Sequence, residues 1–253
     1  MKLTHRLAAL VCTCLLGVTI VPGAALAGAL YNGLANLTLT LASVNGGTSI
    51  PDGVGTRYQT GVLGSSTLAE GNASAAAVET LQPGDIESAM GIGDRLIQVS
   101  NSYGQAGNSA GYATSLMQTD GIIVLSNQSN ASVTVRLVYD FSAEVTALID
   151  EAGRDAGADA GWSIGDDLGN MILSNSIFAD AILGPQYQLL TLTDYFELVL
   201  APTEERILYS MVDSSGFAEA PAPPVWALLG AGFGLFAAIR RRTRGVRSRV
   251  CEA

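Results

Sequence analysis

Alternation of apolar and polar residues is the dominant pattern in the middle of the chain. It is clearest over residues 133–141, and it continues through Val145 and Ala147. On one parity stand Val133, Val135, Leu137, Tyr139 and Phe141, and on the other Thr134, Arg136 and Asp140. Successive residues of a strand point to opposite faces of a sheet, so this pattern predicts one long, half-buried strand. The apolar run 121–127 and the turn-like Asn127–Asn130 precede it, which predicts a hairpin of the two segments.

Shorter alternating segments flank this region. Leucines alternate with threonines over 37–41 before the turn residues Asn45-Gly46-Gly47, and the runs 190–200 and 207–211 are separated by Ala201-Pro202-Thr203-Glu204. Strand, short turn and strand in this order are typical of antiparallel β-sandwiches. We therefore predict a mainly β fold, an antiparallel β-sandwich with minor helix.

Three segments depart from the strand pattern. The alanine-rich segment 73–81 and the segment 166–183 are predicted to be helical. Residues 151–165 are rich in Gly, Ala and Asp and are predicted to form a mobile loop. Residues 218–224 are predicted to be an extended linker, because proline restricts both itself and the residue before it.

The N-terminus has the composition of a cleaved secretory signal peptide. Lys2 and Arg6 precede an apolar segment, residues 7–21, and Ala25-Leu26-Ala27 provides a small-x-small cleavage site before Gly28. A membrane anchor is the alternative, but the apolar segment is short and Pro22-Gly23 precedes the cleavage sequence. We expect residues 1–27 to be removed after Ala27 during export.

A second apolar segment, Val225 to Ile239, lies near the C-terminus. As a helix it is about 22 Å long at about 1.5 Å per residue, against a bilayer core of about 30 Å. Six arginines follow it, beginning with Arg240-Arg241-Arg242, which places the tail in the cytoplasm by the positive-inside rule. We predict a short transmembrane helix that holds the upstream domain outside, with a permanent anchor as the alternative.

The order of proline motif, apolar segment and arginine cluster resembles the PEP-CTERM sorting domain of Gram-negative bacteria. The resemblance covers about the last thirty residues; Pro221-Ala222-Pro223-Pro224 stands where that family has Pro-Glu-Pro, and the chain continues to Cys251-Glu252-Ala253. It implies transient recognition by an exosortase-like membrane peptidase at the inner membrane. It also implies delivery to the cell surface or an exopolysaccharide matrix, with Pro221, Pro223, Pro224 and Arg240–Arg242 as the sorting residues.

Between these ends, residues 28–217 are predicted to form one exported domain, with residues 218–253 as linker and tag. Residues 28–220 carry five arginines against 22 aspartates and glutamates, a net charge of −17. Lys2, His5 and the three cysteines all lie outside this range. A disulfide framework is therefore excluded there, and nucleic-acid binding is disfavoured because it depends on cationic side chains.

The same absences restrict the possible chemistry. Gly161-Trp162-Ser163-Ile164-Gly165 matches a nucleophile elbow, but no histidine or lysine is left to activate Ser163. Zinc and other transition metals lack imidazole and thiolate ligands, so we predict no cofactor. Calcium needs only oxygen ligands, and acids of the expected loop could supply a loose site. These acids are Asp150, Glu151, Asp155, Asp159, Asp166 and Asp167.

Together these features predict a non-catalytic, structural protein of the cell surface or matrix. Two alternatives stay open. One is a polysaccharide-binding module, assisted by calcium in one version. The other is an exported hydrolase that uses a pair of carboxylates, although Trp162 is the only tryptophan between the two ends and sugar sites usually carry several aromatic residues.

Overall fold

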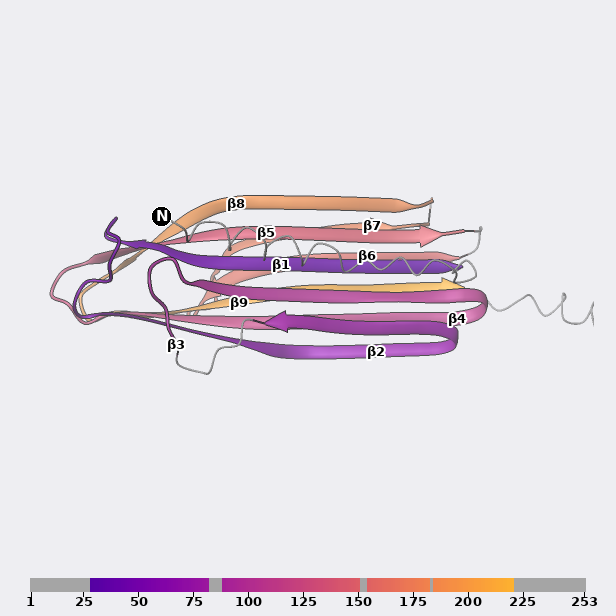
Figure 1. Cartoon of the computed structure of the whole chain (residues 1–253), viewed down its shortest axis with the longest axis horizontal. Coiled ribbons are helices and arrows are strands. Elements are labelled where there is room, and N and C mark those ends of the chain that lie inside the picture. The colour runs from indigo at the N-terminus through magenta and orange to yellow at the C-terminus, as the bar shows by residue number, and fades with distance from the viewer. Residues whose placement is uncertain (1–27, 82–87, 151–153, 183, 221–253) are drawn as a thin grey trace, which may run out of the picture.

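The computed structural model describes residues 28–81, 88–150, 154–182 and 184–220. The expected signal peptide and the expected sorting tag lie outside these residues. The described residues form strands and turns, without a helix (Figure 1). The strands are β1 (Ala29–Val44), β2 (Val54–Leu81), β3 (Ser88–Ala89), β4 (Arg95–Asn127), β5 (Val133–Ile149), β6 (Asp155–Asp166), β7 (Met171–Asp180), β8 (Gln186–Leu200) and β9 (Glu205–Ala220).

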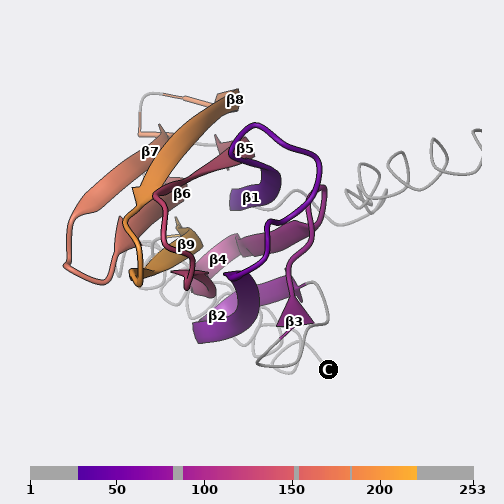
Figure 2. The ribbon, with the colours of Figure 1, turned by 90° about the vertical axis from the view of Figure 1, so that its left-hand side faces the viewer.

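All nine strands belong to one hydrogen-bonded sheet, and every pairing in it is antiparallel. The order along the sheet is β7-β6-β9-β4-β1-β5-β8, with β2 paired to β4 and β3 paired to β2. The predicted mainly β, antiparallel class is confirmed. The sheet curls so far that its two edges, β7 and β8, lie on the same side of the molecule (Figure 2).

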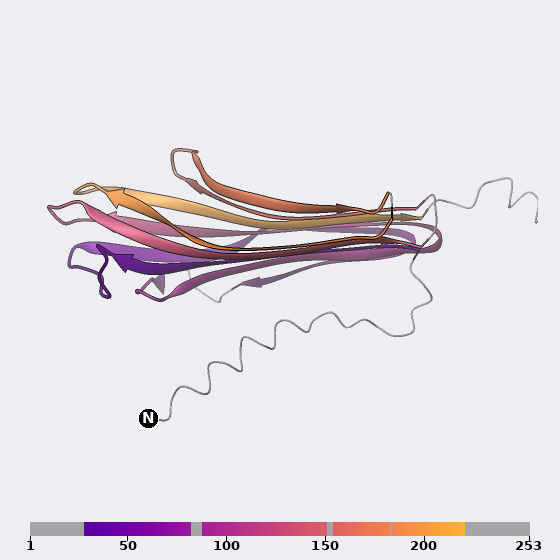
Figure 3. The ribbon, with the colours of Figure 1, turned by 90° about the horizontal axis from the view of Figure 1, so that it is seen from above.

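Two long strands carry the sheet from one layer into a second. Residues 95–106 of β4 pair with β1, whereas residues 111–126 pair with β9. Strand β2 follows β4 through the same bend, with residues 54–71 against 111–127 and residues 73–81 against 98–106. Both strands reverse direction at one end of the molecule, as Figures 1 and 3 show.

Packing between the layers forms the core. Trp162 of β6 lies 5.1 Å from Tyr139 and 5.5 Å from Phe141 of β5 between ring centroids, although β5 and β6 are not paired. Buried and partly exposed residues alternate along β1, β5 and β9, so one side chain in two points into this interior. A large apolar interior therefore holds the domain together.

Glycine is required at the bend. Gly71 has a φ of +67°, and a Cβ added to it would lie 2.2 Å from the carbonyl oxygen of Ala110 on β4. A second glycine is needed inside the core, because a Cβ on Gly216 of β9 would lie 2.2 Å from the Tyr31 ring. In both places the backbone approaches its neighbour more closely than any side chain allows.

Two predicted features of the arrangement differ from the structure. The expected sandwich implied separate sheets, but β2 and β4 run through both layers and make one continuous sheet. The predicted hairpin of 121–127 and 133–147 is wrong, since β1 lies between β4 and β5 in the sheet. A connection does follow Asn127, but the two strands that it joins are paired with other strands and not with each other.

The predicted helices and loop are also wrong. Residues 73–81 form the second limb of β2, residues 171–180 form β7, and β6 occupies most of the expected mobile loop. The segment 218–220, expected in the linker, completes β9. Helix propensity is worth only tenths of a kcal/mol per residue, so pairing with a neighbouring strand overrides it. Among the described residues no helix is long and apolar enough to cross a membrane.

Candidate functional site

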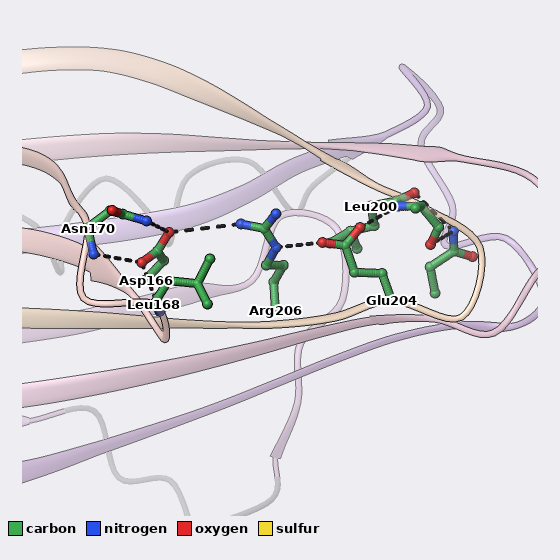
Figure 4. A network of polar contacts seen from close by, with 8 residues as sticks. Asp166, Leu168, Asn170, Leu200, Glu204 and Arg206 are labelled. Atoms are coloured by element: carbon green, nitrogen blue, oxygen red, sulfur yellow. Dashed lines mark hydrogen bonds and ion pairs between the residues drawn. The ribbon is translucent and has the colours of Figure 1, made fainter.

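The densest group of charged contacts gathers where β6 ends, β8 ends and β9 begins (Figure 4). Arg206 lies at its centre. Its Nε donates to Glu204 Oε1 at 2.6 Å, and its Nη1 lies 3.9 Å from Asp166 Oδ2. The guanidinium thus bridges two carboxylates that are 38 positions apart in the chain, one at the end of β6 and one in the β8–β9 connection.

Asp166 organises the β6–β7 turn. Its Oδ1 accepts hydrogen bonds from the backbone N–H groups of Leu168 at 3.0 Å and Asn170 at 2.8 Å, and its Oδ2 accepts from the Asn170 amide at 3.0 Å. A short acceptor side chain at the start of a turn commonly takes this role. These bonds, led by the one from the Asn170 side chain, lower the pKa of Asp166.

Glu204 and Asn127 fix the facing turns. Glu204 Oε2 accepts from the Ala201 N–H at 2.6 Å, and its backbone carbonyl accepts from the Asn127 N–H at 2.8 Å. The buried amide of Asn127 donates to the carbonyls of Ala131, Leu200 and Ala201 at 2.8 to 3.1 Å. The turn carbonyls near Asn127 are satisfied by this one side chain.

The charged groups of this network stabilise one another's ionised forms. The Ala201 N–H and then Arg206 lower the pKa of Glu204, and Glu204 is the main cause that raises the pKa of Arg206. Each carboxylate is held ionised by groups that also engage its oxygens. A general acid or base needs a pKa near the working pH and a free lone pair, so the network is suited to fixing turns rather than to catalysis.

A second polar group lies inside the core. The Tyr31 hydroxyl of β1 donates to Ser115 Oγ of β4 at 2.7 Å, and burial raises the Tyr31 pKa to about 12. Nearby, Ser100 Oγ donates to the Met117 carbonyl at 2.6 Å, and Ser210 Oγ donates to Gln98 Oε1 at 2.6 Å. Each of these bonds joins the layer of β1 and residues 95–106 of β4 to the layer of residues 111–126 of β4 and β9, so together they tie the two layers.

Asp159 of β6 and Asp213 of β9 form a pair that sequence reasoning did not identify. Asp159 is opposite Ser215 and Asp213 is opposite Gly161, so the two carboxylates are diagonal neighbours on the outward face. Burial raises the pKa of both, and the charge of Asp213 raises that of Asp159 further. The sequence offers one signal, the alternation of Asp with small residues over 155–161, which is legible only once the register with β9 is known.

The structure separates most of the candidate residues that the sequence suggested. Ser163 lies in the middle of β6, opposite Ser174 of β7, and not on a strand-to-helix turn. Asp150 forms an ion pair with Arg154, while Asp155 and Asp166 stand at opposite ends of β6. The expected loop of calcium ligands is therefore a strand, and in the described ranges no three acids, histidines or cysteines gather as a metal site.

Of the predicted processing residues, only Gly28 belongs to the described part of the chain. Ala25, Ala27, Pro221, Pro223, Pro224 and Arg240–Arg242 lie outside the described residues. Gly28 is the first described residue, and its backbone carbonyl accepts from the Asp150 N–H at 3.2 Å.

Comparison with known proteins gives no family. No protein-family model matches the chain, and no curated protein matches it. A solved structure, the secreted serine protease VesC from Vibrio cholerae, aligns at 7% identity and a TM-score of 0.12. The alignment covers 68% of this chain and 48% of that one, so this chain spans about half of the protease structure. A likeness this small carries no argument about fold or activity.

Proposed function

We propose that this chain is an exported, non-catalytic structural protein, sorted by its C-terminal PEP-CTERM-like tag to the cell surface or exopolysaccharide matrix of a Gram-negative bacterium. The observation that carries the proposal is the order of segments in the sequence. A signal-peptide pattern precedes Gly28, and a proline motif, an apolar segment and an arginine cluster follow Ala220. In the proposed topology, an exosortase-like membrane peptidase processes the tag at the inner membrane.

The described residues support a structural role in two ways. Strands β1 to β9 run from Ala29 to Ala220, so the proposed exported part is occupied by one continuous sheet. Its densest charged network consists of groups that engage one another and hold turns together. Such a domain offers stability and an extended surface, which suit a component of a surface layer or matrix.

Neutralising the arginine cluster tests the sorting step. Replacing Arg240, Arg241 and Arg242 by glutamine is expected to abolish tail removal and to leave the protein in the membrane fraction. Replacing Arg244, Arg247 and Arg249 by glutamine removes the same charge and is the matched control, expected to be processed normally. Immunoblots of membrane, surface and medium fractions measure both. Normal processing of the first variant would refute the proposed sorting.

Polysaccharide binding is the second candidate, favoured by a row of outward side chains across four strands. Tyr187 of β8 is opposite Thr146, Thr146 is opposite Asn32, and Asn32 is opposite Tyr103 of β4. Both tyrosines are about half exposed, and three strand spacings of about 4.8 Å place them about 14 Å apart. Aromatic faces with amide and hydroxyl groups between them can hold a short stretch of glycan.

Pull-down with the purified matrix polysaccharide tests this candidate. Replacing Tyr103 and Tyr187 by alanine is expected to reduce retention at least tenfold. Replacing Tyr209, an exposed tyrosine on β9 in the other layer, is the matched control and should leave retention unchanged. Equal retention of the unaltered chain, the Tyr103/Tyr187 double variant and the Tyr209 variant would exclude this surface as a glycan site.

A further inference from the structure

Two identical dipeptides, Asn32-Gly33 and Asn45-Gly46, occupy very different places in the fold. The first lies inside β1. The second belongs to the turn that follows β1, at the end of the molecule opposite the bend of β2 and β4 (Figure 1). In an Asn-Gly pair the following backbone nitrogen can attack the asparagine amide with little hindrance, because glycine has no Cβ to shield it. The fold therefore decides which of the two pairs can react.

The turn at Asn45 is tight and exposed. Its two central residues have positive φ, +52° for Asn45 and +70° for Gly46, and the Gly47 N–H donates to the Val44 carbonyl at 2.9 Å. This is the two-residue hairpin turn in which Asn-Gly is preferred. Asn45 and Gly46 are both exposed, and a Cβ on Gly46 would meet nothing within 4 Å. Solvent therefore reaches the amide of Asn45 and the nitrogen of Gly46.

Both reacting groups of this turn are prepared for the attack. The side-chain Oδ1 of Asn45 accepts from the Thr134 N–H at 2.8 Å, and the Asn45 N–H donates to the Thr134 carbonyl at 2.7 Å. A donor on Oδ1 draws electrons from Cγ and stabilises the oxyanion that forms when a nucleophile adds there. Among the residues that the structure describes, the Gly46 N–H has no hydrogen-bond acceptor. Its nitrogen is therefore available to turn toward Cγ.

The matching pair in β1 is held on both sides. Gly33 is opposite Ser102 of β4 and Val145 of β5, so the peptide groups around it take part in two ladders. Gly33 is buried, and a Cβ on it would lie 2.7 Å from the carbonyl oxygen of Asp159. Ring closure requires rotation of the peptide between Asn32 and Gly33, and this rotation would break the strand pairing. Asn32 therefore shares the chemistry of the turn asparagine but not its freedom.

We propose that Asn45 is a site of spontaneous, one-way modification, at which the folded protein loses ammonia and gains a carboxylate. The Gly46 nitrogen gives up its proton and bonds to Asn45 Cγ, and the Cγ–Nδ2 bond breaks, so that ammonia leaves and a succinimide ring closes. Water then opens the ring. Attack of water at Cγ gives aspartate, and attack at the backbone carbonyl carbon gives isoaspartate, in which the main chain continues through Cγ.

Isoaspartate changes the turn more than the added charge does. It lengthens the main chain by one atom in a turn whose ends are joined by the bond between Gly47 and Val44. The Cγ carbonyl that accepts from the Thr134 N–H becomes part of this longer main chain, so the bond to Thr134 and the turn no longer form together. Conversion therefore releases the end of β1 from the start of β5.

Peptide mapping of the aged protein tests the site. The full chain, purified in mild detergent, is incubated folded and, in parallel, unfolded in guanidinium chloride, both in mildly alkaline water enriched in heavy oxygen. Fragmentation mass spectrometry then locates each asparagine that has exchanged its amide nitrogen for labelled oxygen. In the folded chain Asn45 is expected to convert and Asn32 to stay intact, whereas in the unfolded chain the two should convert at similar rates. Equal conversion of both in the folded chain, or an intact Asn45, overturns the proposal.

Gly46→Ala is the matched variant for the mechanism. Its Cβ meets nothing within 4 Å, so it shields the attacking nitrogen without a clash, and circular dichroism checks that the strands remain. Conversion of Asn45 is expected to slow at least tenfold, and an unchanged rate overturns the mechanism. Hydrogen exchange tests the consequence. The Thr134 N–H should exchange faster in the isoaspartate form than in fresh Asn45→Asp, which carries the same charge on an ordinary backbone; equal exchange overturns the release of β1.

Discussion

The hydroxyl of Tyr31 donates to Ser115 Oγ at 2.7 Å, across the interior between β1 and the second limb of β4. The Tyr31 side chain has no exposed surface, and its ring covers Gly216 of β9. One residue thus connects β1, β4 and β9. Loss of its hydroxyl leaves a buried serine oxygen without this donor, whereas loss of its ring opens a cavity.

The first prediction separates these two losses. Tyr31→Phe is expected to lower the free energy of unfolding by about 1–2 kcal/mol, because the hydrogen bond is lost. Tyr31→Ala is expected to lower it by about 3–5 kcal/mol, because the ring is lost as well. Urea unfolding measures both. Equal effects would show that ring packing contributes nothing here.

The raised pKa of Tyr31 gives a second, pH-dependent prediction. The folded pKa of about 12 exceeds the ordinary value of 10.0, since burial disfavours the phenolate. The folded state therefore holds this proton more tightly, so the stabilisation is complete below pH 10 and is lost as the pH rises through 12. The free energy of unfolding, measured between pH 9 and 12, should fall steeply with pH, and it should fall less steeply in Tyr31→Phe. An equal dependence on pH in the two proteins would contradict this prediction.

Much of the fold was readable from the sequence because period-two alternation survives in the central strands. Val133 to Phe141 alternate strongly, and β5 is indeed a long strand. Strand β6 alternates too, but its inward residues Ala156, Ala158 and Ala160 are so small that the pattern was interpreted as a loop. Small residues fit there because the layers approach closely. The size of side chain that fits on this face of β6 depends on the layer packed against it, and a local sequence pattern carries no information about that layer.

Pairing between distant segments was the part that the sequence could not supply. The hairpin expected around Asn127 was wrong because β1, more than 80 positions earlier, takes the place between the two strands. Asp159 and Asp213 become neighbours for the same reason, through the β6–β9 register. Strand order depends on long-range contacts whose energies no single segment encodes.

The pair Asp159 and Asp213 leads to the third prediction. Both carboxyls have raised pKa values, so their neutral forms are favoured in the folded state. The stabilisation that these two carboxyls contribute is complete at a pH below the ordinary pKa of aspartate. It is lost as the pH rises through their higher pKa values in the folded state. Asp213→Asn should raise the melting temperature at pH 7 by about 1–3 °C, and it should lower the pKa of Asp159.

Two measurements check the aspartate prediction. Melting curves at pH 7 give the stability, and NMR titration of the Asp159 carboxyl gives its pKa with and without Asp213. Asp140→Asn, on the outward face of the other layer, is the control for removal of a charge alone. An unchanged Asp159 pKa in Asp213→Asn would contradict the predicted coupling.

Asn127 carries the fourth prediction. Its buried amide donates to three turn carbonyls, and its Oδ1 accepts from the Ser129 N–H and hydroxyl. Asn127→Ala should lower the free energy of unfolding by about 2–4 kcal/mol, since several buried partners lose their bonds. Asn127→Asp keeps the acceptor and loses the donors, so it should cost at least as much at pH 7. Guanidinium unfolding measures both, and a loss below 1 kcal/mol in either variant would contradict the role given to this amide.

The bend at Gly71 gives the last prediction, because a second glycine supplies a control for backbone strain. Gly71 and Gly93 both have positive φ, +67° and +89°. A Cβ on Gly93 would meet nothing within 4 Å, whereas one on Gly71 would lie 2.2 Å from the Ala110 carbonyl oxygen. Gly93→Ala should therefore cost only the strain of a left-handed alanine, about 1 kcal/mol. Gly71→Ala must also push β2 away from β4 where both strands reverse, and it should cost more than about 3 kcal/mol. Urea unfolding of both variants decides it: equal losses would mean that β2 can leave β4 freely at the bend, and the continuity of the two layers would then rest on β4 alone.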